Sequence, residues 1–353
     1  MDLERQVELV TREPTEEIVT LDELIRILES NPRPKHYIGL EISGLLHLGS
    51  LVLTGYKIND FINAGFQCTV LLADWHTYIN DKLQGDWDMI RKVSRYYEDA
   101  FKFFCPGVNV MLGSKLYEEY KIYWEDAVRL SKHITLPRLM RSLTIMGRSE
   151  KDRLDFAQLI YPVMQAVDIH ALDVDVAHAG IDQRKVHMLA RDIFPKLGWK
   201  VPIAVHHHLL PGLGEPTMLG LDDDSEMDRK VSSKMSKSKP YTSIFVHDDE
   251  ETIISKVRKA YCPEGVVDGN PVLELARYII FHEFKEFTVE RAEKYGGNIT
   301  FTSYKELESS YLNRRLHPLD LKSAVALYLN KVIEPIRNHF KNRIEVMEIM
   351  ARQ

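Results

Sequence analysis

Short apolar segments of strand length alternate with longer segments of helical periodicity through the first part of the sequence. The segment QCTVLLAD, at residues 67–74, is almost continuously apolar, as expected of a strand covered on both faces. This alternation predicts an α/β fold, a Rossmann-like, doubly wound parallel sheet flanked by helices. Further strands are expected at 35–42, 108–112, 173–180 and 200–208, and helices at 46–63, at 86–104 and from there through 148.

The pattern changes near residue 240, after a lysine-rich stretch, and helical periodicity then dominates to the end of the chain. Helices are expected at 248–261, 270–284 and 319–350, with a short strand at 297–301. We therefore divide the chain into an acidic N-terminal segment (1–30), an α/β domain (31–240) and a mostly helical domain (241–353).

Composition excludes several classes of protein. No run of 18 or more apolar residues occurs and the N-terminus is acidic from its second residue, so we expect no membrane span and no signal peptide, and a cytoplasmic protein. Cys68, Cys105 and Cys262 lie far apart in the sequence, which argues against a disulfide framework or a zinc knuckle.

The net charge of −6 does not indicate a nucleic-acid-binding protein, but the charge is unevenly distributed. Residues 311–353 carry eight Lys and Arg against four Asp and Glu. Such a basic segment is either a surface that contacts phosphates or an ordinary solvated helix surface.

The stretch EISGLLHLGS, residues 41–50, lies at a predicted strand-to-helix turn. A helix N-terminus there presents free N–H groups to an anion, and His47 can donate hydrogen bonds to phosphate oxygens. Gly44 and Gly49 allow close approach of a ligand or of the backbone. The spacing fits neither a dinucleotide-binding fingerprint nor a P-loop, and a packing or capping histidine is the alternative.

A second stretch, DRKVSSKMSKSKPYTS, interleaves four lysines with serines at residues 228–243. A mobile loop of this composition can close over a polyphosphate and neutralise the charge of a departing pyrophosphate. A solvated basic loop is the alternative.

Together the two stretches resemble the signatures of class I aminoacyl-tRNA synthetases. HLGS is similar to the first signature, HIGH, and KMSKS at 234–238 is identical to the second, about 185 residues later. Segments such as YIGLEISGLLHLG, LLADWHTYIN and KAYCPEGVVDGNP extend the resemblance to the archaeal and eukaryotic type of tyrosyl-tRNA synthetase, with tryptophanyl-tRNA synthetase as the alternative. The resemblance implies ATP with accompanying Mg²⁺, L-tyrosine and tRNA(Tyr) as ligands, and a homodimer formed near residues 115–150.

The resemblance also implies site residues. Tyr37 and Asp168 match the residues that bind the phenol oxygen, and Tyr161, Gln165 and Gln183 match those near the α-amino group. The catalytic residues are expected to be His47, Lys234 and Lys237. The expected ATP-binding residues are Gly39, Glu41, Gly49, Ser50, Lys234, Met235, Ser236, Lys237 and Ser238. Ser50 replaces the second histidine of the family pattern.

In the C-terminal domain, Tyr295 and Asp320 match positions that stack on and hydrogen-bond the first anticodon base. An aromatic ring and a carboxylate suit these two contacts. The resemblance therefore implies that residues 241–353 bind the anticodon.

The spacing of Tyr161, Gln165 and Asp168 supports the resemblance independently, because it places them on one face of a helix. Polar groups on an otherwise apolar face need partners, and a substrate phenol would supply one for Asp168. Tyrosyl-tRNA synthetases as a class reject phenylalanine by about 10⁵-fold through such a contact, so no editing domain is required.

We assign no function to two other polar stretches. The histidines at 206–208 alternate faces of a strand, so at most two converge, and no metal site is expected. The stretch DDDSEMD, residues 222–228, is expected to be a solvated acidic loop.

Overall fold

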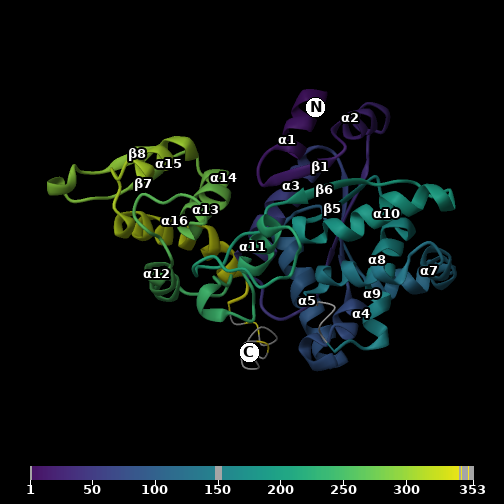
Figure 1. Ribbon diagram of the computed structural model, residues 1–353. Coiled ribbons are helices and arrows are strands. Elements are labelled where there is room, and N and C mark those ends of the chain that lie inside the picture. Colours follow the sequence, from purple (N-terminus) through teal and green to yellow (C-terminus); the bar gives the residue numbers. More distant parts are fainter. Residues whose placement is uncertain (1, 148–152, 342, 344–348, 350–353) are drawn as a thin grey trace. The chain divides into compact units, whose positions relative to one another are not determined.

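A computed structural model of the chain describes residues 2–147, 153–341, 343 and 349 (Figure 1). The chain folds into two compact units. The first unit comprises residues 1–44 and 54–208, and the second comprises 45–53 and 209–353. The segment that carries HLGS therefore belongs to the same unit as KMSKS.

The first unit is built on a six-stranded sheet with the order β1-β6-β5-β2-β3-β4. Strands β2 to β6 pair in parallel, as the apolar runs predicted. The bounds are β1 (Thr15–Val19), β2 (Lys35–Leu40), β3 (Gln67–Leu72), β4 (Asn109–Leu112), β5 (Val176–Gly180) and β6 (Ile203–His207).

Strand β1 was not predicted, and it makes the sheet mixed because it pairs antiparallel with β6. Its sequence, TEEIV, lacks the apolar run of a central strand, as is usual for a strand at a sheet edge. The sheet is therefore predominantly parallel, with one antiparallel strand at this edge.

The strand order reverses at β2, which pairs with β3 on one side and with β5 on the other. In open α/β sheets such a reversal leaves a crevice beyond the carboxyl ends of the strands. The predicted doubly wound fold is confirmed.

The helices of this unit are α1 (Leu3–Thr11), α2 (Leu21–Ser30), α3 (Thr54–Asn63), α4 (Asp74–Ile79), α5 (Trp87–Phe104), α6 (Gly113–Glu119), α7 (Tyr123–Ser131), α8 (Leu136–Ser142), α9 (Phe156–Ala171) and α10 (Arg184–Leu197), with short 3₁₀ turns at Lys82–Gly85, Leu143–Met146 and Ile181–Gln183.

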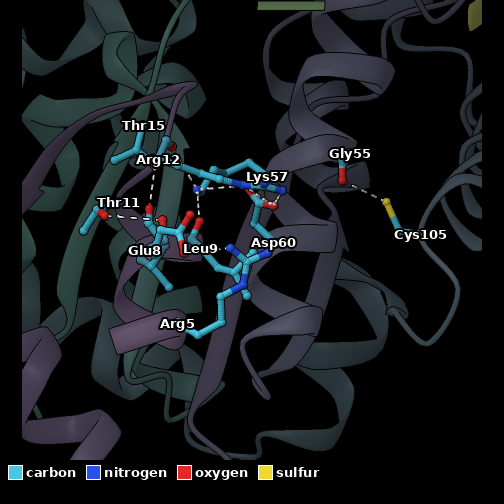
Figure 2. A network of polar contacts seen from close by, with 11 residues as sticks. Arg5, Glu8, Leu9, Thr11, Arg12, Thr15, Gly55, Lys57, Asp60 and Cys105 are labelled. Atoms are coloured by element: carbon cyan, nitrogen blue, oxygen red, sulfur yellow. Dashed lines mark hydrogen bonds and ion pairs between the residues drawn. The ribbon is translucent and has the colours of Figure 1, made fainter. Parts of the chain in front are cut away.

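A fully buried lysine fastens the N-terminal helix α1 to α3 (Figure 2). Lys57 Nζ donates to the carbonyls of Leu9 (2.7 Å) and Arg12 (3.3 Å) and to Asp60 Oδ2 (3.1 Å). Asp60 also pairs with the Arg12 guanidinium. Burial lowers the pKa of Lys57 to about 8, although Asp60 partly opposes this shift. The N-terminal residues, predicted only to be acidic, are thus part of the packed unit.

A row of buried histidines crosses the sheet from β2 to β6. His178 lies between His36 (3.0 Å) and His207 (2.7 Å), with ring nitrogens in hydrogen-bonding contact on both sides. Burial lowers the pKa of His36 to about 3 and that of His207 to about 4. These imidazoles are therefore neutral near pH 7.

The second unit is mostly helical, with one two-stranded antiparallel sheet. The predicted strand at 297–301 is confirmed as β8, but its partner β7 was not predicted. The elements are a π-helix (Leu48–Leu53), α11 (Ser225–Ser233), a 3₁₀ turn (Pro240–Thr242), α12 (Glu250–Lys259), α13 (Pro271–Leu275), a second π-helix (Ala276–Ile280), α14 (Phe281–Glu283), β7 (Phe287–Val289), a 3₁₀ turn (Glu293–Tyr295), β8 (Ile299–Phe301), α15 (Tyr304–Leu312) and α16 (Pro318–His339).

Two predicted helices differ in their bounds. The helix expected at 46–63 is a π-helix over Leu48–Leu53 followed by α3, and π-helical turns often mark functional sites. The helix expected at 319–350 ends at His339, and residues 344–348 and 350 lie outside the described residues. In the described part of the chain, every helix is too short or too polar to span a bilayer.

Candidate active site

The predicted tyrosine-binding residues of the first unit cluster near the point where the strand order reverses. Tyr37 lies on β2 and Gln183 follows the end of β5. A Cβ atom at Gly39 would come within 2.4 Å of the Tyr37 hydroxyl oxygen, so only glycine leaves room for this ring. Gly39, which is predicted to bind ATP, therefore leaves the space that the Tyr37 hydroxyl occupies.

Helix α9 contributes Tyr161, Gln165 and Asp168, and all three are buried. Because all three lie within this one α-helix, their spacing places them on one face, as predicted. Gln165 Nε2 donates to Gln183 Oε1 (3.1 Å), and Gln183 Nε2 donates to the carbonyl of Ile145 (2.8 Å). The structure thus joins two of the predicted amino-acid-binding residues directly.

Asp168 has a protein partner that the sequence did not reveal. The Tyr123 hydroxyl, on α7, lies 2.7 Å from Asp168 Oδ1 and donates to it. Burial raises the pKa of Asp168 to about 7, although hydrogen bonds from Tyr123 and Tyr117 oppose the shift. Asp168 Oδ1 is therefore hydrogen-bonded within the protein, by a residue on another helix.

His76, on α4, is a second residue that was not predicted, although it lies in the segment LLADWHTYIN. It is 2% exposed, and its ring packs edge-on against Tyr161 with centroids 4.5 Å apart. Its Nε2 atom lies 3.9 Å from Asp168 Oδ2, too far for a hydrogen bond. Burial lowers the pKa of His76 to about 4, so the ring is neutral.

The hydroxyl of Tyr37 and the carboxylate of Glu41 are two further predicted groups of this unit. Burial, and then the charge of Asp168, hold the pKa of Tyr37 well above its usual range, so its hydroxyl stays a donor. Glu41, just past β2, accepts a hydrogen bond from Asn80 Nδ2 (2.7 Å) and pairs with Lys82 at 3.8 Å.

In the second unit, the first and last residues of HLGS, His47 and Ser50, are hydrogen-bonded to each other. His47 N–H donates to Ser50 Oγ (2.9 Å), and Ser50 N–H donates to His47 Nδ1 (3.3 Å). Burial, with the charges of Lys237 and Lys234, holds the pKa of His47 well below its usual range. A neutral imidazole that accepts at Nδ1 carries its proton on Nε2, which is therefore a donor.

The KMSKS segment follows helix α11 and is held by backbone contacts. Met235 N–H donates to the carbonyl of Leu210 (2.8 Å), and Ser243 Oγ donates to the carbonyl of Ser236 (2.6 Å). The hydroxyls of Ser236 and Ser238 lie 2.9 Å apart.

Four consecutive residues, 243–246, contact both signatures. Ser243 binds Ser236 as described, and the next residues form a short antiparallel bridge with the HLGS turn. Leu48 N–H donates to the carbonyl of Ile244 (3.0 Å), and Val246 N–H donates to that of Leu46 (3.0 Å). The structure therefore brings together two motifs that are far apart in the sequence.

The stretch DDDSEMD was predicted to be a solvated loop, and this is wrong for its second half. Asp224 caps helix α11, and Asp228 is buried. Asp228 accepts hydrogen bonds from the N–H groups of Gly220 (3.1 Å) and Leu221 (2.7 Å). Asp228 thus anchors the loop that precedes α11.

The three histidines at 206–208 have separate partners. His206 contacts His187 and Glu17, His207 contacts His178, and His208 contacts Glu16. Across residues 2–147 and 153–341, no group of three or more His, Cys, Asp or Glu side chains is arranged to hold a metal ion.

Comparison with known proteins identifies the family. The family model described as tRNA synthetases class I (W and Y) matches residues 29–334. The chain belongs to this family. It is 47% identical over 371 aligned residues to the tyrosine–tRNA ligase of Thermococcus sibiricus, covering 99% of this chain and 98% of that protein.

Solved structures place the chain among the tyrosyl-tRNA synthetases of archaeal type. The tyrosyl-tRNA synthetase of Pyrococcus horikoshii, solved with L-tyrosine, is 44% identical with a TM-score of 0.91, and each chain is fully covered. The enzyme from Aeropyrum pernix is 41% identical with a TM-score of 0.86, covering 100% of this chain and 99% of that one.

The residues that this synthetase is expected to use on the anticodon lie in the second unit. Tyr295 is 62% exposed, in the turn between β7 and β8, and Asp320 lies in the first turn of α16. Arg291 connects the two regions, because its guanidinium donates to the carbonyls of Gly297 (2.9 Å) and Arg315 (3.0 Å).

Proposed function

We propose that the chain, a tyrosine–tRNA ligase, converts L-tyrosine and ATP to tyrosyl-adenylate and then transfers tyrosine to the 3′ end of tRNA(Tyr). Full-length relatives at 44 to 47% identity are tyrosine ligases, which disfavours the tryptophan alternative. The observation that carries the choice of amino acid is the buried carboxylate of Asp168 among neutral phenols. Such a site favours a substrate with a hydroxyl.

Tyrosine is bound by the first unit in this proposal. Tyr37 and Asp168 bind the phenol oxygen, since both are buried and Tyr37 keeps its proton. Tyr161, Gln165 and Gln183 bind near the α-amino group, which is supported by the direct contact between the two amides.

The first step needs no protein nucleophile. The tyrosine carboxylate attacks the α-phosphate of ATP in line, pyrophosphate leaves, and the protein positions the reactants and stabilises negative charge. His47 Nε2–H donates to the nucleotide phosphates, and Lys234 and Lys237 neutralise the departing pyrophosphate. The remaining ATP-binding residues in this proposal are Gly39, Glu41, Gly49, Ser50, Met235, Ser236 and Ser238.

Mg²⁺ accompanies ATP in this proposal and is a part of the substrate. Mg²⁺ is usually held by substrate phosphates and water with only one or two carboxylates. The lack of a preformed metal-binding cluster among the described residues fits this mode of binding.

We assign catalysis to residues 31–240 and anticodon binding to residues 241–353. Tyr295 stacks on the first anticodon base, and Asp320 accepts a hydrogen bond from it. The exposure of Tyr295, and the link that Arg291 makes between the two regions, support this assignment.

The synthetase acts as a cytoplasmic homodimer in this proposal. Large apolar side chains are exposed on helices α7 and α8 and just before α7, within the expected interface near residues 115–150. Residues 148–150 of that range lie outside the described residues. Burying these side chains against a second copy would remove apolar surface from water. They are Ile122, Trp124, Val128 and Leu136.

The test is amino-acid-dependent pyrophosphate exchange with tyrosine, tryptophan and phenylalanine side by side. Exchange with tyrosine, and only background with the other two, is expected. Exchange with tryptophan as fast as with tyrosine would overturn the assignment.

A further inference from the structure

Tyr123 and Tyr117 are two phenols beside Asp168 to which the proposed mechanism gives no role. Tyr123 is fully buried and donates to Asp168 Oδ1 at 2.7 Å, with its oxygen also 3.1 Å from the carbonyl oxygen of Met164. The Tyr117 ring lies against the Tyr123 ring with centroids 4.2 Å apart, and its hydroxyl is 3.4 Å from His76 Nδ1. Two phenols, one from α6 and one from α7, therefore lie beside the carboxylate.

A buried carboxylate stays ionised only where hydrogen-bond donors or positive charges compensate for lost hydration. His76, whose Nε2 atom lies 3.9 Å from Asp168 Oδ2, is neutral and therefore supplies no positive charge. The hydrogen bond that the Tyr123 hydroxyl donates to Asp168 Oδ1 therefore compensates for the lost hydration of that oxygen.

We propose that Tyr123, with Tyr117 packed against it, is a positioning residue that determines tyrosine specificity by holding Asp168 Oδ1 and leaving Oδ2 to accept the substrate phenol. The inference rests on the proposed function, since it concerns the same site. Tyr123 acts through Asp168 and contacts the substrate only indirectly.

This arrangement has a consequence for pH dependence. The groups that face Asp168 are Tyr117 on α6, Tyr123 on α7, Asp74 and His76 on α4, Tyr37 on β2 and Tyr161 on its own helix. The hydrogen bond from Tyr123 lowers the Asp168 pKa and so keeps the carboxylate ionised to lower pH. Without Tyr123, Asp168 takes up its proton at a higher pH.

The experiment compares Tyr123→Phe with the unaltered enzyme in pyrophosphate exchange. Loss of a hydrogen bond to a charged group should raise KM for tyrosine about tenfold or more. KM for ATP should stay unchanged, since ATP does not use the phenol contact. Tyr117→Phe, which leaves the Tyr123 hydrogen bond in place, should raise KM for tyrosine by a smaller factor.

Tyr120→Phe is the matched control. Tyr120 lies three residues before Tyr123, and its hydroxyl also donates to an aspartate, Asp126 Oδ2, at 2.7 Å. Because Asp126 is not part of the proposed site, this variant should keep the KM for tyrosine of the unaltered enzyme.

The pH profile separates positioning from a general packing defect. In the unaltered enzyme, KM for tyrosine should rise as pH falls below about 7, where Asp168 becomes protonated. In Tyr123→Phe this rise should begin at higher pH. A parallel rise in KM for tyrosine and for ATP, or an unshifted profile, would overturn the inference. No tyrosine-dependent exchange in the unaltered enzyme would instead overturn the proposed function.

Discussion

Ser50 and His47 exchange hydrogen bonds across the HLGS turn, each accepting from the backbone N–H of the other. The Ser50 hydroxyl oxygen therefore acts as a capping group, because it accepts a hydrogen bond from the His47 N–H at the start of a helix. At the same time its own N–H fixes the His47 ring with Nε2 as the donor. The serine that replaces the second histidine of the family pattern thus orients the histidine that remains.

Substitutions in this turn should have unequal effects on the rate of adenylation. His47→Ala should lower the single-turnover rate by more than tenfold, because it removes a donor aimed at charge that develops in the transition state. Ser50→His should change the rate by less than about tenfold, within roughly 1.4 kcal/mol, since a histidine also offers a donor there. A His47→Ala enzyme as fast as the parent would contradict this view of the turn.

Asp168→Ala should weaken tyrosine binding by roughly 2 kcal/mol or more while leaving ATP affinity unchanged. The variant removes the acceptor of the phenol and also leaves the Tyr123 hydroxyl without its carboxylate partner. Isothermal titration with each ligand separately measures both affinities. Equal losses for tyrosine and ATP would mean that Asp168 supports the fold and has no direct contact with the substrate.

The central sheet could be predicted from sequence because strands such as β3 and β5 are largely buried and mostly apolar. Strand β1 could not be, since an edge strand such as TEEIV needs only part of its surface buried. Strand β7 has three residues, too few to show a period of two.

The site residues were expected from the family resemblance, and spacing could support that expectation only where residues share an element. Tyr161, Gln165 and Asp168 follow helical spacing on α9, which supported their choice. Tyr123 lies 45 residues before Asp168 in the sequence, and its contact depends on how α7 packs against α9. Three tyrosines spaced by three, at 117, 120 and 123, were the available sequence signal, although only two of them face the site.

Replacing the lysine beneath α1 should destabilise the first unit. Lys57→Met leaves the carbonyls of Leu9 and Arg12 without this donor and removes one of the two cations paired with the buried Asp60, at a cost of about 3 kcal/mol. Urea unfolding measures the change. Lys102→Met is the control, because Lys102 forms an exposed pair with Glu98 that should contribute less than about 1 kcal/mol. Equal midpoints for the two variants would show that the buried network adds little.

The row of buried histidines should make the fold sensitive to acid. The His207 pKa falls from its ordinary value of 6.5 to about 4 on folding, so between these values the unfolded chain holds more protons than the folded one. Stability therefore declines as pH falls from 6.5 to about 4. His207→Gln, which cannot take up a proton, should reduce the slope of unfolding free energy against pH by about one proton in this window. An unchanged slope would show that His207 is not neutral in the folded enzyme.

Anticodon recognition should be separable from adenylation, because Tyr295 and Asp320 lie in residues 241–353, which contain neither the HLGS and KMSKS segments nor the proposed tyrosine-binding residues. Asp320→Ala and Tyr295→Ala should each reduce kcat/KM for tRNA by about tenfold or more, since a base–aromatic stack contributes roughly 1–3 kcal/mol. Tyrosyl-adenylate formation without tRNA should stay at the parental rate in both variants.

Glu334→Ala controls for the loss of a negative charge near the RNA, because Glu334 is an exposed carboxylate on the same helix as Asp320, four turns later. It should charge tRNA as the parent does. The comparison uses aminoacylation with tRNA(Tyr) and with a transcript changed only at the first anticodon base. The parent should discriminate between the two, whereas Asp320→Ala should charge both at the same reduced rate, because the lost acceptor is the group that reads that base. If Asp320→Ala lowered adenylate formation in step with charging, or kept the parental preference for the natural anticodon, the assignment of Asp320 would be wrong.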